Sequence, residues 1–257
     1  MALRLAFAYN TEKLGEDGSF GRKSYKEILL TRYFREALSR LNPWITSAQM
    51  EEAQKIMERH LSTSSLLQIN EEKYFLIRDG IPVTVKKPGG RTETKNAVVI
   101  DFQNPENNHF LAIKELKIHG GLYRRRTDIV GFVNGLPLLF VELKKNTVDV
   151  RDAYTNNYTD YLDTIPHLFY YNAFLILSNG TEAKVGTLGS KYEFFHEWKR
   201  LSEQDQGSVA PFPGAHARAA GVRRRRRGAF EGLPVCVQCA GVSPAVLHGC
   251  APAESAQ

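Results

Sequence analysis

Residues 127–133 and 136–144 are two strand-like segments that are separated only by Asn134-Gly135. An Asn-Gly pair between apolar segments is the strongest short-range signal of a β-hairpin, because both residues of its turn must adopt positive φ. The second segment is uninterruptedly apolar over residues 138–141, which is typical of a buried strand. We therefore expect a sheet to be built around this hairpin.

The rest of the chain alternates helical and strand-like patterns, which predicts an α/β fold with a mixed sheet flanked by helices and a helical N-terminal part. Asn42-Pro43 ends the first helix, and Thr46 or Ser47 caps the second. The expected helices cover residues 24–41, 46–60, 66–78, 148–164 and 192–201, and the expected strands cover 96–102, 110–119, 127–133, 136–144, 173–178 and 184–188.

Charged residues gather where the two hairpin strands would lie together. Side chains alternate along a strand, so Glu142 and Lys144 share one face while Leu143 takes the other. Asp128 begins the partner strand. A strict two-residue loop would pair Asp128 with Val141, whereas one bulged residue would pair it with Glu142. The sequence leaves this register open.

Two carboxylates and a lysine at the end of a buried strand are costly to remove from water. Neighbouring carboxylates also repel unless a hard cation lies between them, and Mg²⁺ accepts one or two protein carboxylates together with water and phosphate oxygens. With a lysine to hold or help deprotonate the attacking water, such a cluster suits metal-assisted hydrolysis of a phosphodiester. A structural Glu–Lys pair at a strand end is the other interpretation, and the three residues alone favour it.

Longer segments carry a resemblance to a known family. The stretch RRRTDIVGFVNGLPLLFVELKK at residues 124–145 is accompanied by segments 98–110, 152–180 and 194–201 and by the opening at 10–43. Together they resemble the N-terminal nuclease domain of the R (restriction) subunit of type I restriction-modification enzymes. The resemblance is continuous over residues 1–206, which we expect to be one domain.

The resemblance implies a PD-(D/E)xK nuclease fold, in which Asp128 and Glu142 ligate Mg²⁺ and Lys144 positions the water. Thr127 replaces the proline for which the fold is named. That position is not a metal ligand, so the departure is mild.

Family members often carry a Q-x-x-x-Y motif in the following helix, and the matching positions here are Asn157 and Tyr161. These two positions share a helix face, where they could hold the carboxylates or contact the DNA backbone. The alternative is that Tyr161 packs against the sheet and Asn157 is a surface amide.

The first helix often supplies a further acid in PD-(D/E)xK folds, and Glu27 is the candidate here, followed by Glu36. A basic run just ahead of Asp128 is expected either to contact phosphates or to be an exposed strand entry. Its members are Arg124, Arg125 and Arg126.

The resemblance implies a Mg²⁺-dependent DNA endonuclease that acts on double-stranded DNA, with modification and specificity subunits as partners. In the family the same subunit carries ATP-driven translocase domains. This chain contains no G-x4-G-K-[ST] phosphate loop, so we expect a truncated R subunit that does not use ATP itself and docks its partners incompletely. The alternatives are a non-catalytic DNA- or subunit-binding remnant and a stand-alone PD-(D/E)xK nuclease.

The composition changes near Gly207. Residues 207–257 hold six Arg, no Lys and all three Cys, and they carry most of the net charge of +6. The preceding residues are nearly neutral, so bulk charge does not argue for DNA binding. The tail is interpreted as a basic disordered arm, as a zinc element, or as an out-of-frame product, which its richness in Ala, Gly, Pro and Arg favours. The zinc element would use Cys236, Cys239, His248 and Cys250.

No segment approaches the ~18 consecutive apolar residues of a membrane span. The opening MALRLAFAYN is too short an apolar stretch for a signal peptide. We therefore expect a cytoplasmic protein.

Overall fold

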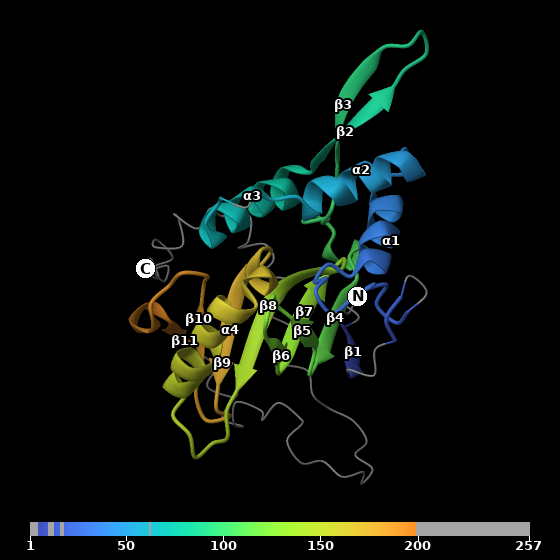
Figure 1. Ribbon diagram of the computed structural model, residues 1–257. Helices are drawn as coiled ribbons and strands as arrows, with labels where there is room; N and C mark the ends of the chain where they lie inside the picture. The colour runs from blue at the N-terminus through green and yellow to red at the C-terminus, as the bar shows by residue number, and fades with distance from the viewer. Residues whose placement is uncertain (1–4, 10–12, 16–17, 62, 199–257) are drawn as a thin grey trace, which may run out of the picture. The chain divides into compact units, whose positions relative to one another are not determined.

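A computed structural model describes residues 5–9, 13–15, 18–61 and 63–198, which are arranged around a seven-stranded sheet (Figure 1). The predicted α/β class with a mixed sheet is confirmed. The boundary expected at residue 206 and the tail lie outside the described residues. None of the described helices reaches the ~20 residues that a bilayer crossing requires.

The helices are α1 (Thr31–Leu41), α2 (Ser47–Glu58), α3 (Leu66–Asp79) and α4 (Thr159–Thr164), with a π-helical turn (Ala153–Tyr158) directly before α4 and short 3₁₀ turns at Pro105–Asn107, Pro166–Phe169 and Tyr192–Phe194. The strands are β1 (Leu5–Tyr9), β2 (Ile81–Lys86), β3 (Thr92–Ala97), β4 (Phe110–Lys114), β5 (Lys117–His119), β6 (Arg124–Arg126), β7 (Ile129–Val133), β8 (Leu136–Leu143), β9 (Phe174–Ser178), β10 (Ala183–Gly186) and β11 (His196–Glu197).

The large sheet has the strand order β1-β4-β7-β8-β9-β10-β11, with β8 in the middle. β8 pairs antiparallel with β7 and parallel with β9. A parallel pair needs a crossover connection, and the π turn and α4 supply it. Residues 136–142 of β8 are all buried, as their uninterrupted apolar character predicted.

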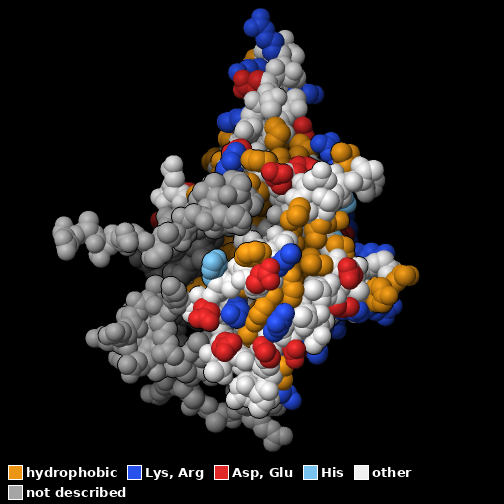
Figure 2. All heavy atoms as spheres, turned by 90° about the vertical axis from the view of Figure 1, so that its left-hand side faces the viewer, with side chains coloured by type: hydrophobic (Ala, Val, Ile, Leu, Met, Phe, Trp, Pro, Cys, Tyr) orange, Lys and Arg blue, Asp and Glu red, His pale blue; other side chains and the backbone are white. Residues whose placement is uncertain are grey.

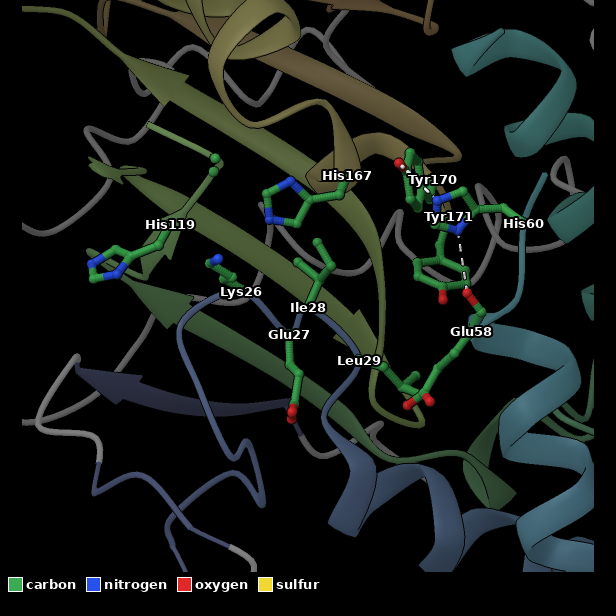
Figure 3. Close-up of a pocket in the computed structure, with 12 residues that line it drawn as sticks. Lys26, Glu27, Ile28, Leu29, Glu58, His60, His119, His167, Tyr170 and Tyr171 are labelled. Atoms are coloured by element: carbon green, nitrogen blue, oxygen red, sulfur yellow. Dashed lines mark hydrogen bonds between the residues drawn. The ribbon is translucent and has the colours of Figure 1, made fainter. Parts of the chain in front are cut away.

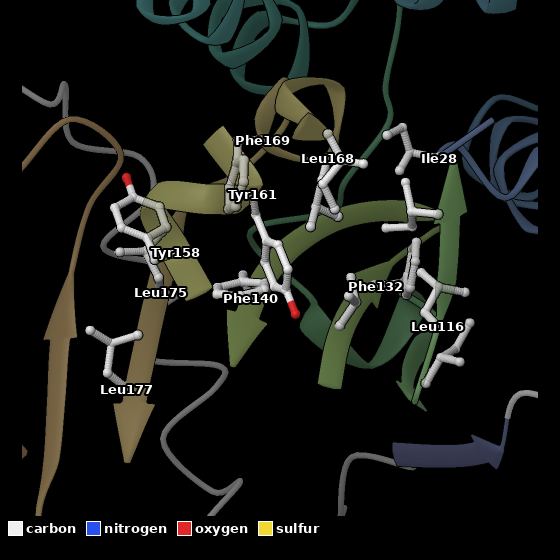
Figure 4. Close-up of a cluster of buried hydrophobic side chains, with 14 of the residues drawn as sticks. Ile28, Leu116, Phe132, Phe140, Tyr158, Tyr161, Leu168, Phe169, Leu175 and Leu177 are labelled. Atoms are coloured by element: carbon white, nitrogen blue, oxygen red, sulfur yellow. The ribbon is translucent and has the colours of Figure 1, made fainter. Parts of the chain in front are cut away.

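The crossover helix packs on one face of the sheet through aromatic side chains (Figure 4). Tyr161 of α4 meets Phe140 of β8 edge-on, with 5.8 Å between ring centroids. Phe169, which follows α4, meets the same phenylalanine at 5.4 Å. These contacts bury the middle of β8 and hold its C-terminal end beside the helix.

The second and third helices begin where their capping residues predicted. Thr46 accepts a hydrogen bond from the backbone of Gln49, whose side chain bonds back to the backbone of Thr46. Ser65 and Gln68 make the same reciprocal arrangement at α3. These capping boxes satisfy backbone donors that the first helical turn leaves free.

The first helix begins at Thr31, so the expectation of a helix from residue 24 is wrong for its first seven residues. Leu30, just before α1, donates its N–H to the carbonyl of Gly135 at 2.9 Å. A Cβ on Gly135 would lie 2.6 Å from the Leu30 carbonyl oxygen, and the residue has φ of 82°. The hairpin turn therefore needs glycine both for its backbone and for this close approach.

The expected strand over residues 96–102 is wrong. Residues 92–97 form β3, which pairs only with β2, and residues 98–102 are in no strand. Every residue of β3 except Ala97 is exposed, so the apolar alternation that indicates a strand is missing. The backbone hydrogen bonds between β2 and β3 hold this strand in place without a buried apolar face.

The strand expected over residues 110–119 is broken at Glu115, which has φ of 58°. β4 ends before it, and β5 after it pairs with β6 in a separate two-stranded sheet. The helix expected over residues 192–201 is also wrong, because a 3₁₀ turn and β11 occupy its described part. β1, which pairs parallel with β4, was not expected.

Candidate active site

The turn between β7 and β8 is a two-residue loop in which Asn134 and Gly135 both have positive φ, of 50° and 82°. These values fit the type I′ turn that the Asn-Gly pair predicted. The register then shifts by one residue inside the hairpin, and Leu138 is the extra residue of this β-bulge. The pairs on either side of the bulge are Phe132 with Pro137 and Gly131 with Leu139.

The bulge decides which residue lies opposite Asp128. Beyond it, Ile129 pairs with Val141, so that the next position outward brings Asp128 opposite Glu142. Residues opposite each other in an antiparallel pair have their side chains on the same face. The register that the sequence left open is thus the one that places both carboxylates together.

Asp128 is fixed to the end of β8 by a hydrogen bond. Its Oδ2 accepts the backbone N–H of Leu143 at 2.7 Å, which holds the carboxylate between Glu142 and Lys144. Burial raises the pKa of Asp128, against the opposing effects of the Leu143 N–H and of the Lys144 ammonium.

Glu142 is a buried carboxylate, with 3% of its surface exposed. Its Oε1 lies 3.9 Å from Nζ of Lys144, and its Oε2 has no hydrogen-bond partner within the part of the chain that the structure describes. Burial, and then the nearby Asp128, raise the pKa of Glu142 to about 8, which Lys144 opposes. The ionised carboxylate of Glu142 therefore lacks the close ion pair and the hydrogen bonds that a buried charge requires.

The two carboxylates fit a hard divalent cation. One free carboxylate oxygen beside a second carboxylate provides the oxygen ligands that Mg²⁺ takes, the remaining positions being filled by water or phosphate. No set of three or more His, Cys, Asp or Glu side chains suited to a metal occurs among the described residues. A site here would accordingly have two side-chain ligands from the protein.

Lys144 is oriented from two sides. Its backbone N–H donates to the carbonyl of Ser178 on β9 at 2.7 Å, and its Nζ donates to Oδ1 of Asn157. Asn157 lies in the π-helical turn, a rare geometry that is frequent at functional sites. The amide is therefore a partner of the lysine and not an isolated surface group.

Tyr161 packs against the sheet, as the structural alternative expected. Its hydroxyl donates to the carbonyl of Arg126 at 3.2 Å, just ahead of Asp128 in the chain. Burial, and then Glu142, raise the pKa of Tyr161 to about 12, so the phenol stays protonated and can donate. Tyr161 thus supports the strand entry that carries Asp128.

The three arginines ahead of Asp128 are not equivalent. Arg125 forms a bidentate ion pair with Asp160 of α4, in which Nε and Nη2 donate to the two carboxylate oxygens at 2.6 and 2.8 Å. Arg126 lies 3.4 Å from the carboxylate of Glu115, and Arg124 is exposed. Two of the three are therefore engaged with carboxylates of this chain.

Glu115 was not singled out from the sequence. Its N–H donates to the carbonyl of Asp128 at 2.8 Å, and its charge contributes to the raised pKa of Asp128. An acidic residue that interrupts an apolar segment is the signal that could have indicated it.

The structure does not bring Glu27 to this cluster, and its placement on the first helix is wrong. It precedes α1, and its carboxylate accepts the backbone N–H of Lys23 at 2.8 Å. It lines a pocket with Glu58 and His167 (Figure 3). Glu36 is exposed on α1 and forms an ion pair with Arg32 at 3.2 Å. Neither residue is placed to join the carboxylate pair.

The buried carboxyl group predicts a pH-dependent stability in the absence of metal. Because the pKa of Glu142 is about 8 in the folded chain against 4.5 for the free group, the folded state binds the extra proton between these values. The contribution of Glu142 to stability is then full below about pH 4.5 and falls as pH rises toward 8, by at most ~1.4 kcal/mol per pH unit. Urea unfolding in EDTA at several pH values measures this slope. Glu142→Gln should reduce this slope and leave the contribution of the raised pKa of Asp128, and an unchanged slope would contradict the assignment.

Comparison with known proteins adds the family. Residues 3–194 match the family described as "Type I restriction enzyme R protein N terminus". The "Type I restriction enzyme HindI endonuclease subunit" of Haemophilus influenzae is 31% identical over 208 residues, which cover 79% of this chain and 19% of that protein. The "Putative type I restriction enzyme MjaIXP endonuclease subunit" of Methanocaldococcus jannaschii is 28% identical over 194 residues, which cover 73% of this chain and 18% of that protein.

The chain spans about a fifth of the length of these relatives. The matched region nevertheless includes every described element of the large sheet up to β10 and all of the site residues above. The resemblance expected from the sequence is confirmed: this chain belongs to the family of type I restriction enzyme R protein N termini.

Proposed function

We propose that Asp128, Glu142 and Lys144 form a Mg²⁺-dependent DNA-cleaving centre of the PD-(D/E)xK type. The observation that carries the proposal is the bulge-set register, which aligns Asp128 with a buried Glu142 whose Oε2 has no described partner. The names of the relatives, which are endonuclease subunits, support a nuclease role in a restriction system.

In this proposal the chain's own residues have distinct tasks. Asp128 and Glu142 would hold the metal, and the Leu143 N–H keeps Asp128 turned toward Glu142. Lys144 would orient the attacking water, and Asn157 holds its ammonium on the site side of β8. When bound, Mg²⁺ supplies Lewis-acid stabilisation of the charge that develops on the phosphate.

Double-stranded DNA is the proposed substrate. Modification and specificity subunits are proposed as partners of the whole protein to which this family region belongs in its relatives. ATP would be used only by such a longer protein, since neither the carboxylate pair nor Lys144 requires it for hydrolysis.

Metal binding tests the centre directly. Glu142→Gln is expected to weaken Mn²⁺ or Mg²⁺ binding by at least about tenfold, because even partners behind a metal ligand contribute that much. Isothermal titration calorimetry of the full chain measures the affinity. Glu36→Gln, which removes an exposed carboxylate of α1, is the matched control and should bind like the unchanged chain. Equal metal affinity in both variants would contradict the proposed ligand set.

A further inference from the structure

The hairpin of β2 and β3 carries a short exposed loop at residues 87–91, with the sequence Lys-Pro-Gly-Gly-Arg. The loop is closed by a hydrogen bond from the N–H of Lys87 to the carbonyl of Arg91 at 2.8 Å. Every residue from 86 to 96 is exposed. Figure 1 shows the two strands extending beyond α2 and away from the large sheet.

This exposed end is basic. Residues 86–96 contain four cationic side chains and one acidic one, so they carry a net charge of +3. Lys87 forms an ion pair with that acid, Glu93, and the ammonium of Lys95 lies 4.1 Å from the ring centroid of Trp44. Lys86 and Arg91 form no ion pair within the described residues, and Figure 2 shows Lys and Arg side chains at this end of the molecule.

The base of the hairpin is anchored to α2 and to the end of α3. The carboxylate of Glu52 on α2 accepts the hydroxyl of Thr84 at 3.0 Å, and Gln49 donates to the carbonyl of Thr84 at 3.1 Å. Asn96 donates to the carbonyl of Asp79 at 3.1 Å. An isolated two-stranded hairpin is marginally stable, so these contacts are what hold the arm in one position. A preorganised arm loses little conformational entropy when it binds.

The chemistry of the arm fits a nucleic-acid backbone better than a protein or a lipid surface. Protein interfaces need aromatic or aliphatic anchors, and residues 86–96 contain no aromatic side chain and, apart from Pro88, no aliphatic one. Lys, Arg and Thr side chains are the usual donors to phosphate oxygens, and Thr92 and Thr94 stand beside the cations. The major groove of B-DNA, about 12 Å wide, admits a two-stranded β-ribbon.

We propose that the β2–β3 hairpin is a DNA-backbone-binding arm, whose Lys86 and Arg91 contact phosphates of duplex DNA. The inference rests on the proposed function in its partner, DNA, but it concerns a surface that is separate from the carboxylate pair. The arm would give the domain a positively charged surface that binds duplex DNA. This binding requires neither a metal ion nor cleavage.

The test is salt-dependent DNA binding by the full chain in EDTA, which prevents cleavage. Fluorescence anisotropy with a short labelled duplex of arbitrary sequence measures affinity between about 50 and 200 mM salt. Lys86→Gln/Arg91→Gln is expected to reduce the magnitude of the slope of log affinity against log salt by about 1.8, because each phosphate contact contributes ~0.9. Affinity at low salt should fall by roughly tenfold or more. The control Lys55→Gln/Lys191→Gln removes the same charge from other exposed positions and should leave the slope unchanged.

Equal slopes in the two double variants, or no binding of duplex by the unchanged chain at the lowest salt, would overturn the proposal. The result is distinguishable from failure of the cleavage centre. Loss of metal binding in Glu142→Gln tests that centre without DNA, and the arm is tested without metal. A chain that binds DNA through the arm but never binds Mg²⁺ would support the arm and refute the nuclease.

Discussion

Lys144→Ala is expected to reduce Mg²⁺-dependent cleavage of plasmid DNA by about 10²–10⁴-fold, the usual contribution of a positioned proton-transfer group. The lysine side chain lies next to the carboxylate pair and is held by Asn157, so its removal takes away the group that orients the water. The backbone hydrogen bond from residue 144 to the carbonyl of Ser178 remains in the variant, so the fold should survive.

Plasmid nicking and linearisation, followed on gels with equal amounts of folded chain, measure this loss. Circular dichroism and the thermal midpoint supply the control for folding, and Lys191→Ala supplies a surface lysine of no expected consequence. Cleavage that persists at the original rate would remove Lys144 from the mechanism. If the unchanged chain binds DNA with or without EDTA but never cuts it, the non-catalytic binding alternative is correct.

Insertion of one alanine between Leu139 and Phe140 is expected to have an equally large effect on cleavage and a larger one on stability. With the turn at Asn134-Gly135 and the one-residue bulge kept, the insertion would bring Val141 opposite Asp128 and move Glu142 to the other face. Phe140 would leave the aromatic cluster at the same time, and burial of a phenylalanine in a core contributes about 3–5 kcal/mol.

Leu138→Met is the matched control, because it keeps both the residue count and the approximate volume and should cost less than about 1.5 kcal/mol. Urea unfolding and the plasmid assay should both separate the two variants. An insertion variant with the stability and cleavage of the original chain would show that this register does not set the site.

Local signals predicted the parts of the fold that depend on a few consecutive residues. Asn134-Gly135 predicted the turn because its positive φ values are accessible to few other pairs. Thr46 predicted the start of α2 because a side-chain oxygen there satisfies a free backbone donor. The polar strand β3 was not predicted at its true position. Its sequence has no alternation of apolar residues, and it is held by backbone hydrogen bonds to β2.

The sequence indicated which residues belong to the candidate site, but it did not indicate how they are arranged in space. The alternation along β8 placed Glu142 and Lys144 on one face, yet Asp128 joins them only through the bulge at Leu138. Nothing local indicated that Glu27 would lie before α1, because residues 24–30 are positioned by contacts such as that between Leu30 and the hairpin turn.

The sequence by itself determined the α/β class, the hairpin and the identities of the three central charged residues, since these follow from periodicity, turn chemistry and motif. Only the tertiary structure decided that the two carboxylates face each other, that Oε2 of Glu142 is left without a described partner, and that Asn157 holds Lys144. The physical reason is that register, burial and helix placement depend on how β8 is packed between β7, β9 and the crossover helix. Those contacts join residues far apart in the chain, which no local pattern encodes.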